Sequence, residues 1–245
     1  MPRHARIVLK GIAHHITQRG NYRQNIFSDN EDREKYIEFL KKYSKKYKLK
    51  LYAYCLMTNH VHFIAVPEKE DSLAFTFKYT NMCYSNYYHR KTRKTGHLWQ
   101  SRFYSCPLHY NHVVEALKYV ERNPVRAKMV EYPWDYRWSS ARAHVLNDID
   151  DKTGDGRRKK NIEKEPAFYS CTIPLYSLSD LEFNWSPEGW KDYLGYPDDE
   201  EFLSKMRRNT FSGSPFFGDT FLEKLEEKLG VPLRRRARGR PAKHK

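Results

Sequence analysis

The sequence is poor in cysteine and has no long hydrophobic run. Its four cysteines, Cys55, Cys83, Cys106 and Cys171, are scattered and form no CxxC pair, which argues against a zinc ribbon and against a disulfide framework. No apolar stretch approaches the roughly 20 residues that a membrane-spanning helix needs. The first fifteen residues contain nothing typical of a signal peptide. We therefore expect a cytoplasmic protein with reduced thiols and no membrane partner.

Acidic residues are scarce relative to basic ones. The 245 residues include 45 Lys and Arg against 30 Asp and Glu, which gives a formal net charge of +15. The excess is uneven, because residues 1–100 contain 19 basic and 8 acidic side chains, whereas residues 161–204 contain 2 and 10. A merely soluble surface would mix the two signs more evenly. This charge distribution favours a polyanionic partner, of which nucleic acid is the commonest.

The pattern of apolar residues predicts an α+β fold. Strands rich in β-branched and aromatic residues are expected at residues 6–21, 49–57, 60–67 and 98–108. Helices with apolar residues at helical spacing are expected at residues 28–48, 71–94 and 111–124, the first with a capping box formed by Ser28 and Glu31. The order β-α-β-β-α-β is that of a ferredoxin-like sandwich, with an antiparallel sheet and helices on one face. The other face should be free to stack unpaired bases.

The composition changes near residue 146. Residues 1–146 would form the main domain, the polar residues 147–170 a linker, and residues 171–230 a small, mostly helical accessory domain. Residues 231–245 form a basic tail that contains "RGRP", in which Arg238 and Arg240 resemble an AT-hook for the minor groove of A·T-rich duplex. A basic tail with only electrostatic affinity for DNA is an equally good interpretation.

Two histidines, His60 and His62, lie one residue apart in the apolar stretch "CLMTNHVHFIAVP". Side chains alternate along a strand, so both imidazoles point to one face, where they could share a metal ion. Two strand histidines with ordinary hydrogen bonds would show the same pattern, so the pair alone is a weak signal. A metal site would need a third ligand from another part of the chain.

The helix expected at residues 111–124 carries further candidates. Tyr119 and Asn123 are four residues apart and lie beside each other on its flank. A tyrosine hydroxyl beside a divalent cation can attack a phosphate, because the cation stabilises the charge that develops on oxygen. Asn123 offers a carbonyl oxygen as the third ligand. The alternative is that Tyr119 is one of 19 tyrosines and simply packs in the core.

Three motifs occur in a characteristic order, "NHVHF", "GHLWQSRFYS" and "ALKYVERNPVRAKMVEYPWDYRWSSARAH". With them the chain resembles the REP-associated tyrosine transposases, relatives of the single-tyrosine insertion-sequence transposases in the HUH nuclease superfamily. The resemblance covers roughly residues 3–146. One departure is Asn59, which stands where some relatives have an acid before the first histidine.

The resemblance implies a site and a reaction. His60 and His62 would bind Mg²⁺ or Mn²⁺, Asn123 would complete the metal site and Tyr119 would be the nucleophile. The implied reaction is cleavage of single-stranded DNA through a 5′-phosphotyrosine at a hairpin of a repetitive extragenic palindrome, in the cytoplasm at the nucleoid. The repeat-associated group is expected to complete its site within one chain, so a monomer is favoured over a domain-swapped dimer.

Other residues are candidates for DNA contacts. Arg19 and Asn21 lie at the end of the first expected strand, and Gln100 and Arg102 lie in "WQSRF", although Arg102 could equally be a structural ion-pair partner. Together with the tail arginines they would hold DNA near the cleavage site.

Two other functions stay open. A domesticated protein could recognise the hairpin without cutting it. An RNA-binding protein could use a similar sheet, but it would be expected to carry a Lys/Arg-Gly-Phe motif that is missing here, and it leaves the histidine pair unexplained. The sequence favours a metal-dependent nuclease and strand transferase.

Overall fold

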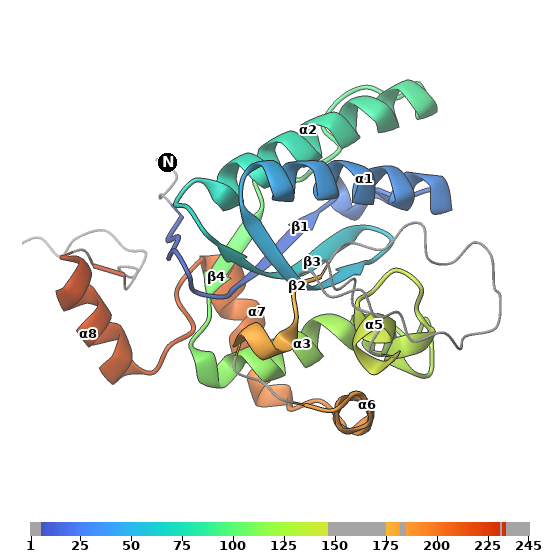
Figure 1. The fold of residues 1–245 in the computed structure, drawn as a ribbon. Helices are drawn as coiled ribbons and strands as arrows, with labels where there is room; N and C mark the ends of the chain where they lie inside the picture. The colour runs from blue at the N-terminus through green and yellow to red at the C-terminus, as the bar shows by residue number, and fades with distance from the viewer. Residues whose placement is uncertain (1–5, 147–174, 182–184, 231, 234–245) are drawn as a thin grey trace, which may run out of the picture.

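The computed structural model describes residues 6–146, 175–181, 185–230 and 232–233. Its centre is a four-stranded antiparallel sheet with strand order β2-β3-β1-β4 (Figure 1). The strands are β1 His14–Arg19, β2 Leu49–Leu56, β3 His60–Pro67 and β4 Tyr104–Pro107. This order confirms the predicted ferredoxin-like α+β class. Strands β1 and β4 are shorter than predicted, and Trp99 joins the sheet only through an isolated bridge to Gly20.

Two long helices, α1 Asn30–Lys46 and α2 Ser72–Thr92, lie side by side on one face of the sheet (Figure 1). Tyr36 of α1 and Tyr84 of α2 are fully buried and meet edge to face with ring centroids 5.2 Å apart. Farther along, Tyr43 and Tyr47 both stack on Tyr79. The tyrosines that recur at helical spacing in α1 therefore form the contact between the two helices.

The cap of α1 is displaced by one residue from the prediction. Asp29, not Ser28, is the N-cap, and its carboxylate accepts a 3.0 Å hydrogen bond from the backbone N–H of Asp32. The Asp32 carboxylate reaches back to the N–H of Ser28 at 2.6 Å. Glu31 instead pairs with Lys91 at the end of α2, at 2.9 Å. The Asp32 side chain thus bonds the residue before the N-cap, whereas the glutamate of the usual capping box bonds the N-cap N–H itself.

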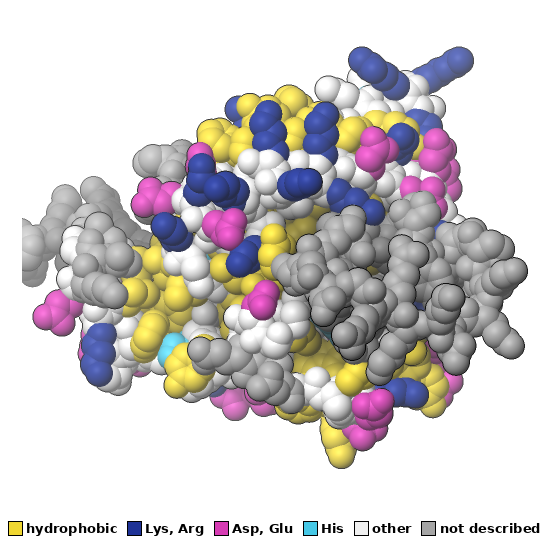
Figure 2. All heavy atoms as spheres, viewed as in Figure 1, with side chains coloured by type: hydrophobic (Ala, Val, Ile, Leu, Met, Phe, Trp, Pro, Cys, Tyr) yellow, Lys and Arg dark blue, Asp and Glu magenta, His cyan; other side chains and the backbone are white. Residues whose placement is uncertain are grey.

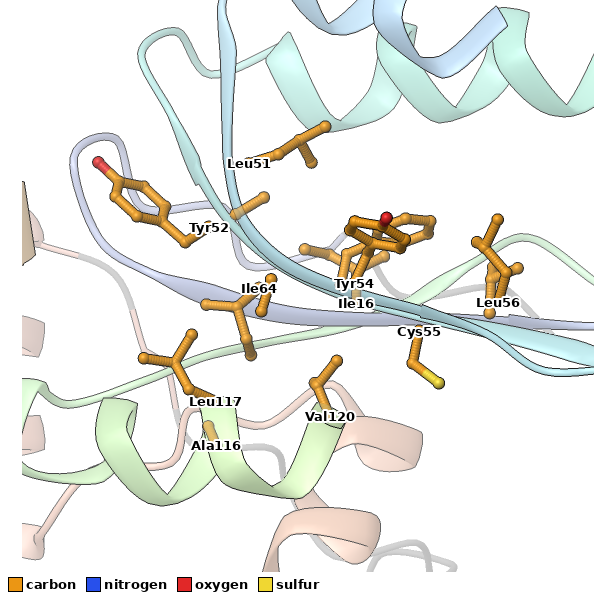
Figure 3. Packing of buried hydrophobic residues seen from close by; sticks show 14 of the residues in the cluster. Ile16, Leu51, Tyr52, Tyr54, Cys55, Leu56, Ile64, Ala116, Leu117 and Val120 are labelled. Carbon is orange, nitrogen blue, oxygen red and sulfur yellow. The ribbon is translucent and has the colours of Figure 1, made fainter. Parts of the chain in front are cut away.

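The second face of the sheet is covered as well, so the expectation of a free face for base stacking is wrong for the described residues. Helix α3, Val113–Glu121, packs on β2 and β3, and α7, Glu200–Ser212, packs on β4 and β1. Leu117 and Val120 of α3 point at Ile64 and Cys55 of the sheet (Figure 3). The apolar stripe of α3 thus has its partner on this face.

The remaining helices are short. They are α4 Asn123–Arg126, α5 Ala141–Leu146, α6 Pro187–Gly195 and α8 Asp219–Leu229, with 3₁₀ turns at Asn21–Arg23, Tyr110–His112, Pro133–Asp135 and Leu178–Leu181. Among the described residues, no helix combines the length and apolarity that crossing a membrane requires.

Helices α6 and α7 join the hydrophobic core of the sheet, through Trp190, Leu194, Leu203 and Met206. Glu121 anchors this part: it is fully buried on α3 and accepts a 2.9 Å hydrogen bond from the indole N–H of Trp190. The predicted linker at residues 147–170 and the tail arginines Arg238 and Arg240 lie outside the described residues. The division into a main and an accessory domain stays a prediction.

Candidate active site

The two histidines of the HxH pair lie at the start of β3, side by side on the face that α3 covers. Their ring centroids are 4.9 Å apart and nearly perpendicular. The register of the sheet places Arg19 of β1 opposite His60 and Thr17 opposite His62. His62 is only 5% exposed, whereas His60 is partly exposed. The pair therefore lies where the covered part of the sheet opens to solvent.

Tyr119 of α3 joins this pair. Its ring meets His62 edge-on with centroids 5.7 Å apart, and the side chain is 5% exposed. The Arg126 guanidinium lies 4.6 Å from the centre of the Tyr119 ring and also donates a hydrogen bond to the Tyr119 carbonyl. The fold thus brings together the histidine pair and the tyrosine that the sequence singled out, with a fixed cation beside the tyrosine.

Asn123 has a local role in the structure. Its Nδ2 donates to the carbonyls of Tyr119 and Val120 at 3.1 and 3.2 Å, and the residue is 9% exposed. These two bonds orient the amide, with its nitrogen toward α3 and its oxygen turned away from those carbonyls. The role of Asn123 as third metal ligand stays a prediction.

Asn59, which the sequence analysis noted only as a departure, determines the tautomer of His60. Its Nδ2 donates to the Arg23 carbonyl at 3.2 Å, so its Oδ1 faces Nδ1 of His60, 2.6 Å away. An amide oxygen can only accept, so His60 carries its proton on Nδ1. The lone pair on Nε2 of His60 is therefore available to a ligand.

His15 is a site residue that the sequence analysis missed. It is 1% exposed on β1, its Nε2 lies 2.9 Å from Nδ1 of His62, and its Nδ1 lies 2.7 Å from the Thr210 hydroxyl on α7. Its ring also meets Tyr119 edge-on at 5.3 Å. The stretch "AHHIT" contained the histidine, but only the placement of β1 beside β3 shows that it faces His62.

Burial keeps these imidazoles neutral. It lowers the pKa of His60 to about 4, with a smaller contribution from Arg19. It lowers the pKa of His15 to about 3, with Arg126 contributing, and it holds the pKa of His62 well below its ordinary value, with His60 and His15 adding to the effect. A neutral imidazole keeps a lone pair for a cation.

The donor set fits a divalent cation. Two neutral imidazoles on one face of β3 are ligands that divalent transition-metal ions accept. Within the part of the chain that the structure describes, no group of three His, Cys, Asp or Glu side chains is arranged to hold a metal ion. The remaining positions around an ion at His60 and His62 must therefore come from another kind of side chain, from water or from a substrate.

The candidate DNA contacts divide into two places. Arg19, Asn21 and Gln100 lie together, because the Gln100 N–H donates to the Arg19 carbonyl at 2.9 Å and the Asn21 N–H donates to Leu98 at 2.8 Å. This group adjoins His60, which lies opposite Arg19. Arg102 is exposed and lies near Arg6. Burial lowers the pKa of Arg6 to about 10, and the charge of Arg102 adds to this effect.

A strained loop beside this group holds an exposed aromatic ring. Tyr22 and Arg23 both have left-handed backbone, with φ of 50° and 59°, and Tyr22 is 94% exposed. The turn requires Gly20, since a Cβ there would lie 2.4 Å from the Gln24 carbonyl oxygen. Strained backbone of this kind clusters at functional sites.

Comparisons with known proteins agree with the motifs. Residues 8–123 match the family model described as "Transposase IS200 like". Among solved structures, the chain is similar to a REP-associated tyrosine transposase bound to a REP hairpin, at 19% sequence identity and a TM-score of 0.48, over 64% of this chain and 93% of that one. A search of curated proteins finds no significant match. Residues 8–123, which include both histidines and Tyr119, are therefore similar to the IS200-like transposases.

Proposed function

We propose that this protein is a metal-dependent single-stranded DNA endonuclease and strand transferase that works through Tyr119. The observation that carries the proposal is the meeting of His60, His62 and Tyr119 on one face of the sheet. A tyrosine that served only as core would pack against apolar neighbours, whereas Tyr119 has two imidazoles and a guanidinium around its ring.

The ring contacts support the following roles. The Tyr119 oxygen attacks a phosphodiester phosphorus, the bond from phosphorus to the 3′ oxygen breaks, and the products are a 5′-phosphotyrosine and a free 3′-hydroxyl. His60 and His62 would hold Mg²⁺ or Mn²⁺, with the Asn123 oxygen as a further ligand. The ion supplies polarisation of the phosphate when bound. The phosphotyrosine conserves the bond energy, so another 3′-hydroxyl can reverse the step and join strands.

The substrate that we infer is a hairpin of a repetitive extragenic palindrome with a single-stranded flank. The net charge of +15 and the Lys and Arg side chains gathered over α1 and α2 support a DNA partner (Figure 2). The exposed ring of Tyr22 is a stacking surface for an unpaired base beside Arg19. The tail arginines Arg238 and Arg240 would add contacts to duplex DNA.

The proposal is tested by incubating the protein with labelled single-stranded hairpins from the flanks of its own gene, in Mn²⁺ or in EDTA. A covalent protein–DNA band on a denaturing gel is expected in Mn²⁺ only. A hairpin that binds tightly and yields neither adduct nor cut product in Mn²⁺ or Mg²⁺ would contradict the enzyme and favour the non-cutting hairpin-binding protein.

We also propose that each chain completes its own site and acts as a monomer. The support is that His60, His62 and Tyr119 of the same chain are already in ring contact. Co-expression of Tyr119→Phe with the double variant His60→Ala/His62→Ala is therefore expected to give no adduct. Recovery of adduct in the co-purified mixture would indicate that two chains exchange α3.

A further inference from the structure

The C-terminal segment reaches the site at two points. Thr210 of α7 contacts His15, and Asp198, between α6 and α7, contacts Arg126. Both residues lie beyond residues 8–123, the part of the chain that matches the transposase family model. No role of these two residues follows from that match.

The first contact is the end of a buried chain of polar groups. Thr210, His15 and His62 are 1%, 1% and 5% exposed, and hydrogen bonds of 2.7 and 2.9 Å join them in that order. Nε2 of His15 and Nδ1 of His62 share one proton, so either ring can be the donor in the hydrogen bond between them. If His62 donates from Nδ1, its Nε2 keeps a lone pair, and His15 carries its proton on Nδ1 and donates a hydrogen bond to the Thr210 hydroxyl. The opposite arrangement puts the His62 proton on Nε2, where it blocks a metal ion.

The first arrangement matches the tautomer of His60, whose Nδ1–H donates to Oδ1 of Asn59. Both histidines would then present Nε2 from the same face of β3. A hydrogen bond on the second ring nitrogen is the usual means by which a protein orients a metal-binding imidazole. Thr210 and His15 occupy that place behind His62.

The second contact holds the cation beside the nucleophile. Asp198 is 9% exposed and accepts from Arg126 and from Arg122, each at 3.1 Å. The same Arg126 guanidinium lies over the Tyr119 ring. A carboxylate shared by two arginines limits their movement, so Asp198 fixes where Arg126 meets Tyr119.

We propose that Thr210 and Asp198 are positioning residues of the C-terminal segment. One acts on the histidine pair of the active site and the other acts on the tyrosine. Thr210 holds the His15 ring in place by a hydrogen bond, and His15 in turn orients the His62 ring. Asp198, through Arg126, sets the orientation of Tyr119. The inference rests on the proposed function for the roles of His62 and Tyr119, and it makes α6 and α7 part of the catalytic machinery.

The first test uses the metal-free protein labelled with ¹⁵N-histidine, with signals assigned from His15→Gln and His62→Gln variants. Long-range ¹H–¹⁵N spectra are expected to show the Nδ1–H tautomer at both His60 and His62. In Thr210→Val, which keeps the shape and loses the hydroxyl, Nδ1 of His15 loses its partner, so the ring signals of His15 and His62 should shift. Mn²⁺ affinity, measured by calorimetry without DNA, should fall by about 10- to 100-fold. Thr210→Ser should restore both readouts.

An Nε2–H tautomer at His62 in the unmodified protein would overturn this half of the inference, as would unchanged Mn²⁺ affinity in Thr210→Val. Neither readout depends on DNA cleavage. A protein that shows the expected tautomers and never cuts DNA would therefore refute the proposed function and leave the positioning of His62 standing.

The second test compares Asp198→Asn with Asp199→Asn. Asp199 is the neighbouring acid. Its carboxylate caps α7 by accepting hydrogen bonds from backbone N–H groups, and the amide oxygen of an asparagine can accept the same bonds. Asp198→Asn is expected to lower kcat of adduct formation by at least about tenfold with KM unchanged, because misplaced reacting groups cost rate rather than binding. Asp198→Glu should recover part of the rate, and Asp199→Asn should behave as the unmodified protein. Equal kcat in the two asparagine variants, or a change in KM alone, would overturn the role of Asp198.

Discussion

Tyr119→Phe is expected to lower formation of the covalent protein–DNA adduct by at least about 10⁴-fold, as removal of a nucleophile does in other enzymes. The change removes only the hydroxyl. The ring keeps its edge-on contacts with His15 and His62 and its place under Arg126, so the fold and the affinity for the hairpin should stay as they are. A denaturing gel in Mn²⁺ measures the adduct, and a native gel in EDTA measures hairpin binding.

The matched control is Tyr104→Phe. Tyr104 lies on β4, pairs with Thr17 of β1 and meets Phe211 of α7 edge to face. Its hydroxyl, like that of Tyr119, is close enough to Arg19 to interact with its charge. This variant should form adduct at the normal rate. If Tyr104→Phe were inactive while Tyr119→Phe still cut at the same phosphate, the nucleophile would be Tyr104 and the proposed roles would be wrong.

His60→Ala and His62→Ala are each expected to weaken Mn²⁺ binding by more than about 100-fold, since loss of a ligand should cost more than loss of a residue that orients one. Cleavage should fall with the metal affinity. The two variants should differ in stability. His62→Ala leaves His15 without its partner inside the core, which costs about 1–3 kcal/mol in the free energy of unfolding. His60 is partly exposed, so its loss should cost less.

Calorimetric titration with Mn²⁺ and urea unfolding measure these two effects. His97→Ala is the control, because His97 is an exposed histidine in the loop before β4 and should affect neither. Unchanged Mn²⁺ affinity in both His60→Ala and His62→Ala would place the metal elsewhere.

The parts of the site that the sequence revealed are those with a local pattern. Two histidines at alternate positions of one strand share a face wherever that strand lies, and a tyrosine on a helix flank keeps its place relative to the residue one turn away. His15, Asp198 and Thr210 have no such signal. Their partners lie 47, 72 and 195 residues away along the chain, so only the order of the strands and the path of α7 bring them together.

The covered second face of the sheet did have a signal in the sequence. Phe63, Ile64, Ala65 and Val66 form a continuous apolar run, and all four are buried. A strand with one face in water alternates polar and apolar residues, whereas a strand covered on both faces does not. The run therefore indicates a second layer, which α3 and α7 supply. Periodicity alone predicts that α3 has an apolar stripe, but not the face on which it packs.

The sequence separation of 195 between His15 and Thr210 also affects the order of events during synthesis. A ribosome adds about 5–20 residues per second, so Thr210 follows His15 by roughly 10 to 40 s. The strands and α1 to α3 are complete well before α7 has left the exit tunnel. A nascent chain can therefore present its basic helices to DNA while His15 still lacks its hydrogen-bond partner Thr210. Binding would precede the capacity to cut, and release of the finished chain would give the protein its complete active site.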